Sequence, residues 1–441
     1  MRQTKIFAAF VSMLLAWALS SASPSLQPDP AAFPGLLSFS AAARSAVRPG
    51  AEILMARYLD LIRGKRIGLI TNHSAILPDR RHILEVLRST PGVSIAALFS
   101  PEHGLAGTEP DGLKVGNSRD DPSGLRIYSL FGETTKPTPE MLKGIDLLVF
   151  DIQDIGVRYY TYSSTLILSL EAAAERGIPY LVLDRPNPIT GIRVEGPILE
   201  SAQKSFIGLV PLPIIHGMTV GELARLVNGE GWLKDGVKAK LRVIAAEGWT
   251  RELWFDQTGL PWVKPSPSMM TMRTAAVYPA TCFLEGTNVS EGRGTETPFE
   301  SIGAPYIDGE KLAADMNGAG LPGVVFRPAK FTPKAIAAVT ADPKYDNIAC
   351  QGIFLEVTDR NAFRPVKTGI YLLSALKRLY PRDFRWRSPA RSTGAFYLDL
   401  LAGTTKIRES LDAGDPPEAI VASTEAGLER FLSLRKRYLL Y

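Results

Sequence analysis

The feature that most constrains the fold of this chain is the alternation, in its first half, of short apolar runs rich in β-branched residues with amphipathic segments. Four runs are predicted to be strands, at residues 66–71, 94–100, 146–152 and 178–184. Segments 82–89 and 162–176 lie between them and carry apolar residues at helical spacing. Strands that alternate with helices predict a mostly parallel sheet covered on both faces, so we expect an α/β fold.

Each predicted strand leads directly into a polar cluster. The four clusters are Thr71-Asn72-His73-Ser74, Ser100-Pro101-Glu102-His103-Gly104, residues 151–160, and Asp184-Arg185-Pro186-Asn187-Pro188. In open parallel sheets the ligand crevice lies beyond the carboxyl ends of the strands. One polar residue at a strand end commonly caps the next helix, but four clusters at one edge favour a binding cleft.

The second half of the chain predicts further elements after a helix at 220–228. Residues 262–305 are rich in Pro, Gly and Thr and are interpreted as a long functional loop, because their aromatic content argues against disorder. Strands near 323–327 and 352–358, a helix at 368–379 and a helical C-terminus with Leu428, Phe431 and Leu432 at core spacing follow. The predicted organisation is a signal peptide at 1–22, a linker at 23–48, a first α/β domain at 49–305 that carries the cleft, and a smaller α/β C-terminal domain at 306–441 that closes it.

The N-terminus resembles a secretory leader. Arg2 and Lys5 precede an apolar run, and small residues end near Ala22, after which cleavage is expected. A membrane anchor is the weaker interpretation, because the run is shorter than the roughly twenty residues of a spanning helix. Export predicts a periplasmic or secreted protein. In that compartment Cys282 and Cys350 could pair or could remain two buried thiols, and the sequence leaves both open.

Charge and histidine content narrow the ligand class. The net charge of +5 is scattered along the chain, which does not predict nucleic-acid binding but suits an anionic substrate. His73, His103 and His216 follow predicted strands or lie in loops, whereas His82 lies in a predicted helix. No spacing typical of a metal site occurs, so no metal or cofactor is expected. Each single histidine is equally compatible with a hydrogen-bonded loop residue.

The carboxylates at the strand ends suit the cleavage of a glycosidic bond. That reaction needs a proton donor and, in most enzymes, a second carboxylate. Glu102 is the predicted donor, since partial burial on a tight turn would raise its pKa towards the working range. Asp154 is the predicted second carboxylate. An N-acetylated sugar could instead use its own acetamido oxygen, with the carboxylate only orienting that group.

Other residues suit the binding of a sugar that carries a carboxylate. Aromatic faces bind sugar rings, and a guanidinium binds a carboxylate through two hydrogen bonds. The predicted substrate-binding residues are Asn72, His73, His103, Asp151, Arg158, Tyr159, Tyr160, Asn187, His216, Glu291 and Arg293.

A competing pattern is that of the penicillin-binding serine enzymes. Ser201-Ala202-Gln203-Lys204 matches their Ser-x-x-Lys element, and Lys367-Thr368-Gly369 matches their Lys-Thr-Gly element. The intermediate element of that class is missing, and a strand-like run at 206–213 follows the serine where a helix is required. This serine hydrolase interpretation is therefore the weaker one.

Five motifs in a fixed order resemble the exo-β-N-acetylmuramidase family from about Gly50 to the C-terminus. They are Asn72-His73-Ser74, Ser100-Pro101-Glu102-His103-Gly104, residues 151–162, residues 184–188 and Glu285-Gly286-Thr287-Asn288. The resemblance implies a Rossmann-like domain, a smaller C-terminal domain, and a cleft where terminal non-reducing MurNAc is released from a β-1,4 link to GlcNAc. It places Glu102 in the glutamate-bearing motif of the family.

The resemblance also sets the expected partners. They are peptidoglycan glycan fragments and the MurNAc-GlcNAc disaccharide, with no nucleic acid and no stable membrane span. The alternative from another functional class is a non-catalytic muropeptide-binding protein with the same cleft. The sequence indicates no oligomeric state.

Overall fold

The computed structural model of the protein describes residues 46–119, 124–389 and 394–441. The predicted signal peptide at 1–22, and the predicted linker up to residue 45, lie outside the described residues. The end of that linker is described, and it is packed: Val47 is buried and donates its N–H to the Thr258 carbonyl at 2.9 Å. Within the described ranges, no helix is both long and apolar enough to cross a membrane.

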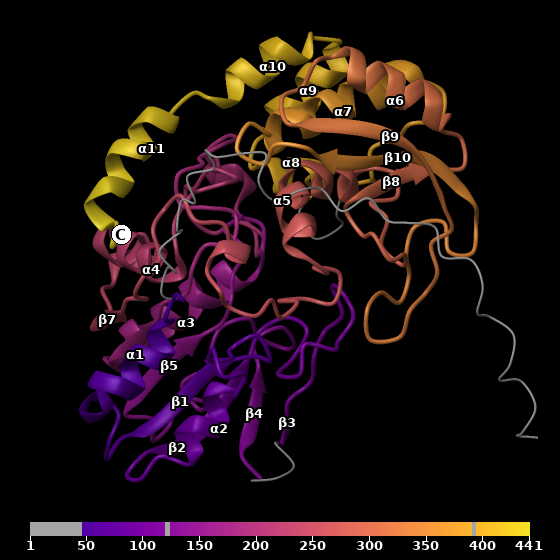
Figure 1. The fold of residues 1–441 in the computed structure, drawn as a ribbon. Coiled ribbons are helices and arrows are strands. Elements are labelled where there is room, and N and C mark those ends of the chain that lie inside the picture. The colour runs from indigo at the N-terminus through magenta and orange to yellow at the C-terminus, as the bar shows by residue number, and fades with distance from the viewer. Residues whose placement is uncertain (1–45, 120–123, 390–393) are drawn as a thin grey trace, which may run out of the picture. The chain divides into compact units, whose positions relative to one another are not determined.

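A seven-stranded sheet forms the N-terminal part of the fold (Figure 1). Its strands, in spatial order, are β3 (Ser118–Arg119), β4 (Arg126–Ser129), β2 (Ser94–Ser100), β1 (Arg66–Thr71), β5 (Leu147–Asp151), β6 (Tyr180–Leu183) and β7 (Leu241–Ile244). All neighbours are parallel except the β3–β4 pair. The mostly parallel α/β sheet is therefore confirmed, and β1 and β2 have the predicted bounds.

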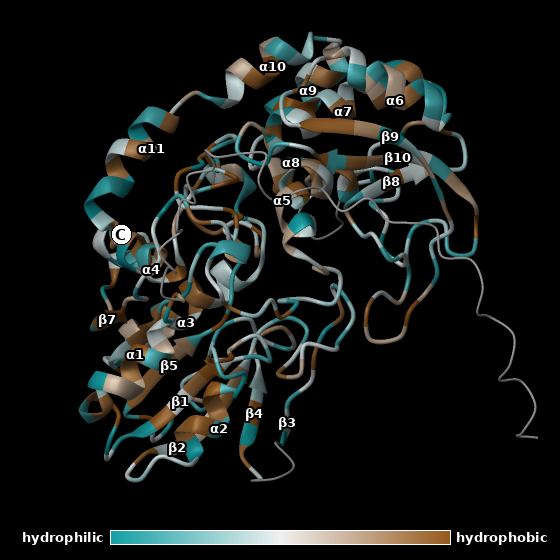
Figure 2. Cartoon of the chain, in the orientation of Figure 1, coloured by the Kyte–Doolittle hydropathy of each residue, from teal (hydrophilic) through white to brown (hydrophobic). Residues whose placement is uncertain are grey.

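Side chains alternate across this sheet and form a core on each face. Ile67 and Leu69 of β1 point to one face, where they pack with α1 (Gly50–Arg57) and α2 (Ile83–Arg88). Ile70 points to the other face, towards α3 (Tyr162–Arg176) and α4 (Val220–Gly229). Figure 2 shows the hydrophobic residues along β1, β2 and β5 between these layers.

A second, smaller sheet is antiparallel, in the order β8-β10-β9. Its strands are β8 (Ser301–Ala304), β9 (Val324–Phe331) and β10 (Cys350–Val357). The helices in the same half of the chain are α6 (Gly309–Gly318), α7 (Pro365–Leu379), α8 (Tyr397–Ala402), α9 (Lys406–Ala413), α10 (Pro417–Thr424) and α11 (Leu428–Arg435). The predicted smaller α/β part is confirmed. The predicted domain boundary after residue 305 stays a prediction. Strand β8 precedes that boundary in the sequence but belongs to the second sheet.

The prediction of one long loop at 262–305 is wrong, because helix α5 (Met272–Thr281) forms inside it. Thr271 caps this helix by accepting a hydrogen bond from the Thr274 backbone. Pro279 lies within it, and the helix is buried on nearly all sides, so it shows no amphipathic period. A helix that contains a proline and lacks an amphipathic period cannot be recognised from sequence patterns.

The hydrophobic core that contains Ile70 is continuous with the core of the second sheet. It includes Ala276 of α5, Ile353 of β10 and Leu373 of α7. Helices α10 and α11 then lead the chain from the second sheet back to α4 (Figure 1). Both cysteines are buried free thiols, so the pairing that the sequence left open does not form in this structure.

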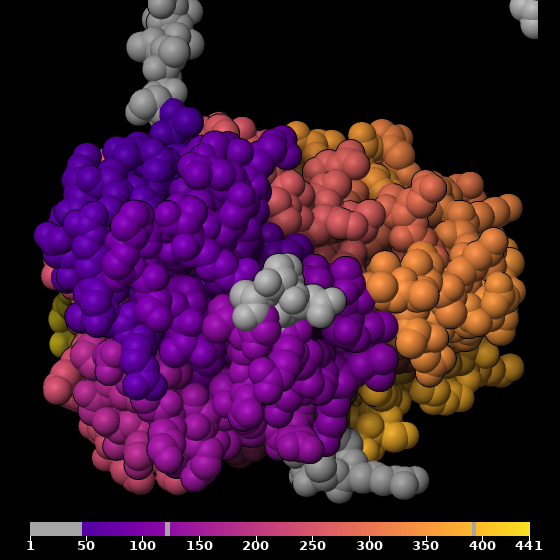
Figure 3. All heavy atoms as spheres, turned by 90° about the horizontal axis from the view of Figure 1, so that it is seen from below, coloured from indigo at the N-terminus to yellow at the C-terminus, as the bar shows by residue number. Residues whose placement is uncertain are grey.

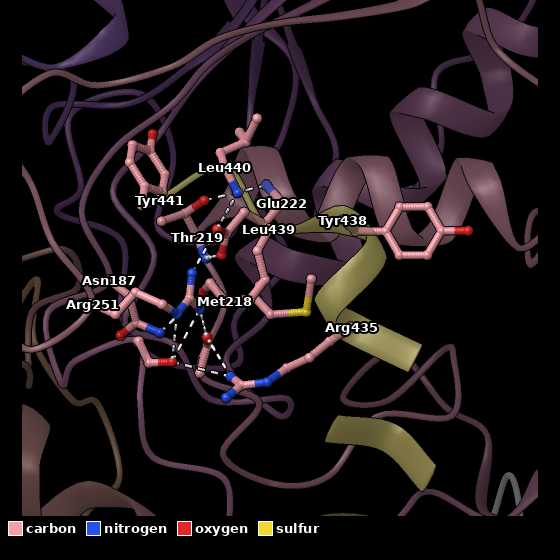
Figure 4. A network of polar contacts seen from close by, with 12 residues as sticks. Asn187, Met218, Thr219, Glu222, Arg251, Arg435, Tyr438, Leu439, Leu440 and Tyr441 are labelled. Carbon is pink, nitrogen blue, oxygen red and sulfur yellow. Dashed lines mark hydrogen bonds and ion pairs between the residues drawn. The ribbon is translucent and has the colours of Figure 1, made fainter. Parts of the chain in front are cut away.

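The final residues of the sequence join a polar network at α4, which we call the C-terminal network (Figure 4). It comprises Asp184, Thr219, Glu222, Arg251, Arg435 and Tyr441. The Tyr441 hydroxyl donates to Asp184 Oδ2 at 2.6 Å, and the Leu440 N–H donates to Glu222 Oε1 at 2.8 Å. The chain end is thus fixed to the carboxyl end of β6.

Candidate functional site

The turn after β2 presents Glu102, which is partly buried. His103 adopts a left-handed backbone conformation, with φ of 70°, and turns the chain sharply. Glu102 Oε1 accepts a hydrogen bond from the Gly112 N–H at 3.0 Å, and Oε2 accepts one from the Thr161 hydroxyl at 2.7 Å. Both oxygens of Glu102 are therefore positioned by donors, one from its own loop and one from the residue before α3.

A partly buried group of charged side chains lies beside this turn, and we call it the Arg293 cluster. It comprises Asp111, Glu285, Glu291, Arg293 and Lys344. Arg293 pairs with Asp111 and donates to Glu285 Oε1 at 2.8 Å, while its Nε lies 3.4 Å from Glu291. Lys344 donates to Glu291 Oε2 at 2.8 Å. One guanidinium thus contacts three carboxylates.

Charge and burial compete within the Arg293 cluster. Burial raises the pKa of Glu285, although Arg293 opposes that shift. Burial alone would also raise the pKa of Glu291, but Lys344 and Arg293 together hold that pKa below its usual value. The two acids differ because Glu291 contacts two cations and Glu285 only one.

The Arg293 cluster connects loops from both parts of the fold. Asp111 belongs to the loop that follows Glu102, and its backbone N–H donates to the Val339 carbonyl at 3.4 Å. The Ser268 hydroxyl donates to Asp111 Oδ2 at 3.1 Å, and Arg293 donates to the same hydroxyl at 2.9 Å. Figure 3, seen from below Figure 1, shows the indigo and purple atoms of the N-terminal part adjoining salmon and orange atoms of the later chain.

Asp154 is buried, whereas Glu102 is partly exposed. Its Oδ2 accepts a hydrogen bond from the Gly156 N–H at 2.6 Å, whereas Oδ1 has no partner among the described residues. Burial raises the pKa of Asp154 to about 7. A cavity of about 10 Å³, which is about the volume that one water molecule needs, is lined by Asp154, Arg185 and Asn187 among others.

Two of the predicted binding residues are fully engaged inside the fold. Asp151 forms a buried bidentate pair with Arg185, with distances of 2.5 and 3.1 Å. Asn72 donates to the Tyr162 hydroxyl at 2.9 Å and accepts from Ser74 at 2.6 Å. The Asp151–Arg185 pair joins the ends of β5 and β6, and Asn72 joins the end of β1 to the start of α3.

The aromatic segment that follows Asp154 is also buried. Arg158 donates to three backbone carbonyls, those of Pro197, Leu212 and Leu401, at 2.7–2.9 Å. Burial lowers its pKa to about 10. The predicted contact between Arg158 and a substrate carboxylate is therefore corrected, since its guanidinium joins interior loops.

Tyr159 and Tyr160 lie in the same interior. The Tyr159 hydroxyl donates to the Pro279 carbonyl at 3.0 Å. Tyr160 packs edge-on against Tyr162, with ring centroids 4.9 Å apart. Neither ring presents an exposed face on which a sugar could stack, so the prediction that they bind sugar by stacking is corrected in the same way.

The predicted histidines separate into three environments. His73 Nε2 lies 2.7 Å from the Lys264 carbonyl, and burial lowers the pKa of this partly buried ring. His103 is buried next to Glu102, with Nδ1 at 2.8 Å from the Glu109 carbonyl. His216 lies in the interior, where burial lowers its pKa to about 3, and there it accepts a hydrogen bond from the Met218 N–H.

Asn187 and His82 have local structural contacts. Asn187 donates to the Met218 carbonyl at 3.0 Å and accepts from the Ile189 N–H at 3.1 Å. His82 is the N-cap of α2 and accepts from the Leu84 N–H at 3.1 Å, so it precedes the helix in which the sequence placed it. Among the residues that the structure describes, no group of three His, Cys, Asp or Glu is arranged to hold a metal ion.

The elements of the serine hydrolase pattern do not meet. Ser201 is exposed and opens a three-residue turn of 3₁₀ helix. Lys367 lies within α7, and its Nζ lies 5.6 Å from the centre of the Tyr371 ring. Thr368 donates to the Arg364 carbonyl at 2.9 Å inside the same helix. The matching sequence elements therefore belong to unrelated local structures.

Sequence reasoning missed Asp111, Gly112 and Thr161, which surround Glu102. Asp111 and Gly112 lie in a polar turn whose partner, Arg293, is distant in the sequence. Thr161 precedes α3 in the manner of an N-cap residue, although its side chain binds Glu102. Thr161 lies inside the motif at residues 151–162, which was the available signal, although the motif did not single it out.

Comparison with known proteins decides the family. Two family models match the chain, "Exo-beta-N-acetylmuramidase NamZ, N-terminal" at residues 67–273 and "Exo-beta-N-acetylmuramidase NamZ, C-terminal" at residues 276–441. The chain belongs to the exo-β-N-acetylmuramidase family. The "Peptidoglycan beta-N-acetylmuramidase NamZ" of Bacillus subtilis strain 168 is 44% identical over 441 residues, covering all of both chains.

Two solved structures resemble this exo-β-N-acetylmuramidase family member in fold. Both are DUF1343 family proteins from Bacteroides fragilis. One has a TM-score of 0.81 and 35% identity, and the other a TM-score of 0.73 and 34% identity. Each match covers 90% of this chain and 99% of the solved chain. The shared fold thus spans both sheets.

Proposed function

We propose that this protein is an exo-acting glycosidase that releases terminal non-reducing N-acetylmuramic acid from β-1,4-linked peptidoglycan fragments such as MurNAc-GlcNAc. The observation that carries the proposal is the position of Glu102. Of the two carboxylates predicted to be catalytic, it is the one that reaches solvent. Family membership supplies the substrate class, because the Bacillus subtilis relative is named a peptidoglycan β-N-acetylmuramidase.

Glu102 acts in this proposal as the proton donor to the leaving sugar oxygen. Cleavage of a sugar–sugar bond needs such a donor, because the departing alkoxide is a poor leaving group. The Gly112 N–H and the Thr161 hydroxyl fix both carboxyl oxygens of Glu102. A proton on Oε2 reverses the hydrogen bond with Thr161, so that the carboxyl O–H donates to the Thr161 hydroxyl oxygen, while Oε1 still accepts from the Gly112 N–H.

The second carboxylate stays a prediction. Asp154 fits that role only if the buried loop that carries it opens, since its oxygens face the interior. The acetamido group of the substrate supplies the alternative nucleophile, which needs a residue that orients it. Other predicted residues lie near the Glu102 turn. His103 follows Glu102 directly, and the His73 N–H donates to the Leu105 carbonyl of the same loop at 2.8 Å. Arg293 pairs with Asp111 and contacts Glu291.

We propose export for this protein from the leader at residues 1–22. The apolar run behind Arg2 and Lys5 is typical of a cleaved secretory signal. A periplasmic or secreted location would bring the enzyme to peptidoglycan. Detection of the mature N-terminus after Ala22 in the exported fraction tests this, and an intact leader on the soluble protein would contradict it.

The decisive experiment compares two substrates and two variants. The substrates are p-nitrophenyl β-N-acetylmuramide, which needs little acid assistance, and the MurNAc-GlcNAc disaccharide, which needs it fully. We expect Glu102→Gln to lose at least about 100-fold on the disaccharide and less on the nitrophenyl substrate. Glu109→Gln, an exposed glutamate on the same loop, is the matched control and should keep wild-type rates.

Three results would change the proposal. If p-nitrophenyl β-N-acetylglucosaminide were cleaved as fast as the muramide, the enzyme would not be specific for N-acetylmuramic acid. Full activity of Glu102→Gln on both substrates would remove Glu102 from the reaction. A wild-type protein that binds MurNAc fragments without cleaving either substrate would be a muropeptide-binding module.

A further inference from the structure

The loop that follows Glu102 is fixed at its far end by the second part of the chain. Asp111 pairs there with Arg293, and the next residue along, Gly112, donates its N–H to Glu102 Oε1 at 3.0 Å. A peptide unit is planar and rigid, so the direction of the Gly112 N–H depends on where the Asp111 backbone is held. The Asp111–Arg293 pair therefore determines one of the two donors on Glu102.

The surroundings of Asp111 strengthen this connection. Its carboxylate accepts hydrogen bonds from Arg293 and from Ser268, and its backbone N–H reaches the Val339 carbonyl at 3.4 Å. The Asp111 side chain is 20% exposed, and that of Arg293 is 16% exposed. Ion pairs of such low exposure are less screened by salt than surface pairs.

Arg293 is itself held from more than one side. Besides Asp111, it contacts Glu285 and Glu291, and its guanidinium carbon lies 4.8 Å from the centre of the Phe299 ring. All three of its nitrogens lie within 4 Å of a carboxylate oxygen of the protein. A substrate carboxylate would have to displace one of these groups before Arg293 could bind it.

We propose that Asp111 and Arg293 are positioning residues that together hold the Gly112 N–H on Glu102. The proposal rests on the proposed function, because it takes Glu102 as the catalytic carboxylate. Arg293 acts on the Glu102 loop by holding Asp111, and the Asp111 backbone passes this restraint to the Gly112 N–H. Thr161 provides the other donor directly and is independent of Arg293.

The titratable groups around Glu102 are identified by the structure. Tyr160, Tyr162 and Tyr397 each have a pKa raised chiefly by burial and further by the charge of Glu102, so all three stay neutral in the working range. His103 lies on the same loop, with Nε2 at 3.9 Å from Asp111 Oδ1. Asp154 acts on Tyr160 and Tyr162 as well, and burial raises its pKa to about 7, so the pH profile is also measured for Asp154→Asn and for His103→Gln.

The test is the pH profile of kcat/KM on MurNAc-GlcNAc for Asp111→Asn. A hydrogen bond donated to a carboxylate favours its ionised form, so its loss favours the protonated form. We expect the limb of the profile that Glu102→Gln abolishes to move up by roughly one pH unit, with kcat lowered more than KM is raised. Thr161→Val should move the same limb in the same direction, because it removes the second donor.

The matched control is Asp315→Asn. Asp315 of α6 pairs with Arg378 of α7 at 2.7 Å, and the Asp315 side chain is 23% exposed, but this pair does not touch the Glu102 loop. It should leave the profile unchanged. Arg293→Lys is the second variant if Asp111→Asn does not fold. It keeps a positive charge in the cluster but lacks the planar fork that spans several carboxylates.

Hydrogen exchange provides a readout that does not depend on activity. The peptide that contains Gly112 should exchange at least about tenfold faster in Asp111→Asn than in the wild type, while Asp315→Asn should not differ. An unmoved limb and unchanged exchange in a folded Asp111→Asn protein would overturn the positioning role alone. A wild-type protein inactive on both substrates would overturn the proposed function as well.

Discussion

The Arg293 cluster and the C-terminal network are both buried polar groups that connect late parts of the chain to the first sheet, yet they are built differently. In the Arg293 cluster three carboxylates surround one guanidinium, and the loop that carries Asp111 continues to a partly exposed Glu102. In the C-terminal network the arginines mainly contact backbone carbonyls. Arg435 donates to those of Gly191, His216 and Gly217.

The two networks differ in whether the carboxylate at their end is accessible to solvent. Within the C-terminal network Glu222 accepts from Arg251, Leu440 and the Thr219 N–H, so its carboxylate is fully engaged inside the fold. The Arg293 cluster instead ends at a carboxylate that solvent can reach. We infer that the first kind of network stabilises the fold, whereas the second also sets the geometry of a reactive group.

The largest expected effect is that of Arg293→Met. It leaves three carboxylates without their common cation, and losing one partner of a buried ion pair costs about 3–5 kcal/mol of unfolding free energy. Arg251→Met is the matched variant in the C-terminal network, and it should cost less because Glu222 keeps two N–H donors. Urea unfolding measures both, and equal losses would erase the distinction between the networks.

The next effect is a pH dependence at Asp154. Its pKa of about 7 in the folded chain, against an ordinary 3.8, means that the folded state holds a proton between these values which the unfolded state has lost. The contribution of Asp154 to the free energy of unfolding therefore falls as the pH rises from about 4 to 7. Asp154→Asn should remove this fall and be more stable than the wild type at pH 8, by on the order of 3 kcal/mol.

Activity of the same variant decides the role of Asp154. If Asp154 is the second catalytic carboxylate, Asp154→Asn loses turnover at every pH. If it is only a buried acid of the fold, turnover is kept while the pH dependence of unfolding disappears. A variant with an unchanged pH dependence of unfolding would show that burial does not hold a proton on this group.

A smaller effect is expected for Tyr441→Phe in the C-terminal network. The change removes the hydroxyl that donates to Asp184 and accepts from the Ala246 N–H at 2.8 Å. We expect a loss of about 1–2 kcal/mol in thermal or urea unfolding, with kcat/KM unchanged. A fall in activity without a fall in stability would mean that this network also acts on the site.

The smallest effect is expected from reducing agents. Cys282 and Cys350 are buried free thiols, so no covalent link supports either network. Dithiothreitol should leave the unfolding midpoint of protein purified without a reducing agent unchanged. A lower midpoint under reduction would show that the two thiols pair in solution.

The first sheet could be predicted because its residues follow simple periods. β1 and α3 have the bounds expected from the sequence, since buried strands and an amphipathic helix leave clear apolar patterns. Helix α5 could not, because it is buried on nearly all sides and contains Pro279. An amphipathic period arises when one face of a helix is buried and the other is exposed, and α5 has almost no exposed face.

The site was predictable only in part. The strand ends correctly indicated where Glu102 lies, but not that Arg158 a few residues after a strand end faces the interior. Asp111 was missed because its contact with Arg293 spans 182 positions of the chain. Such partners are selected by tertiary packing, which single-sequence spacing does not record.

The hydrogen bond between Tyr441 and Asp184 has a consequence for the order of folding. It joins residues 257 positions apart and involves the last residue of this sequence. Contacts of such separation form late, because most of the chain must be ordered before they can close. The carboxyl end of β6 therefore keeps an incomplete set of partners during synthesis until residue 441 has left the ribosome.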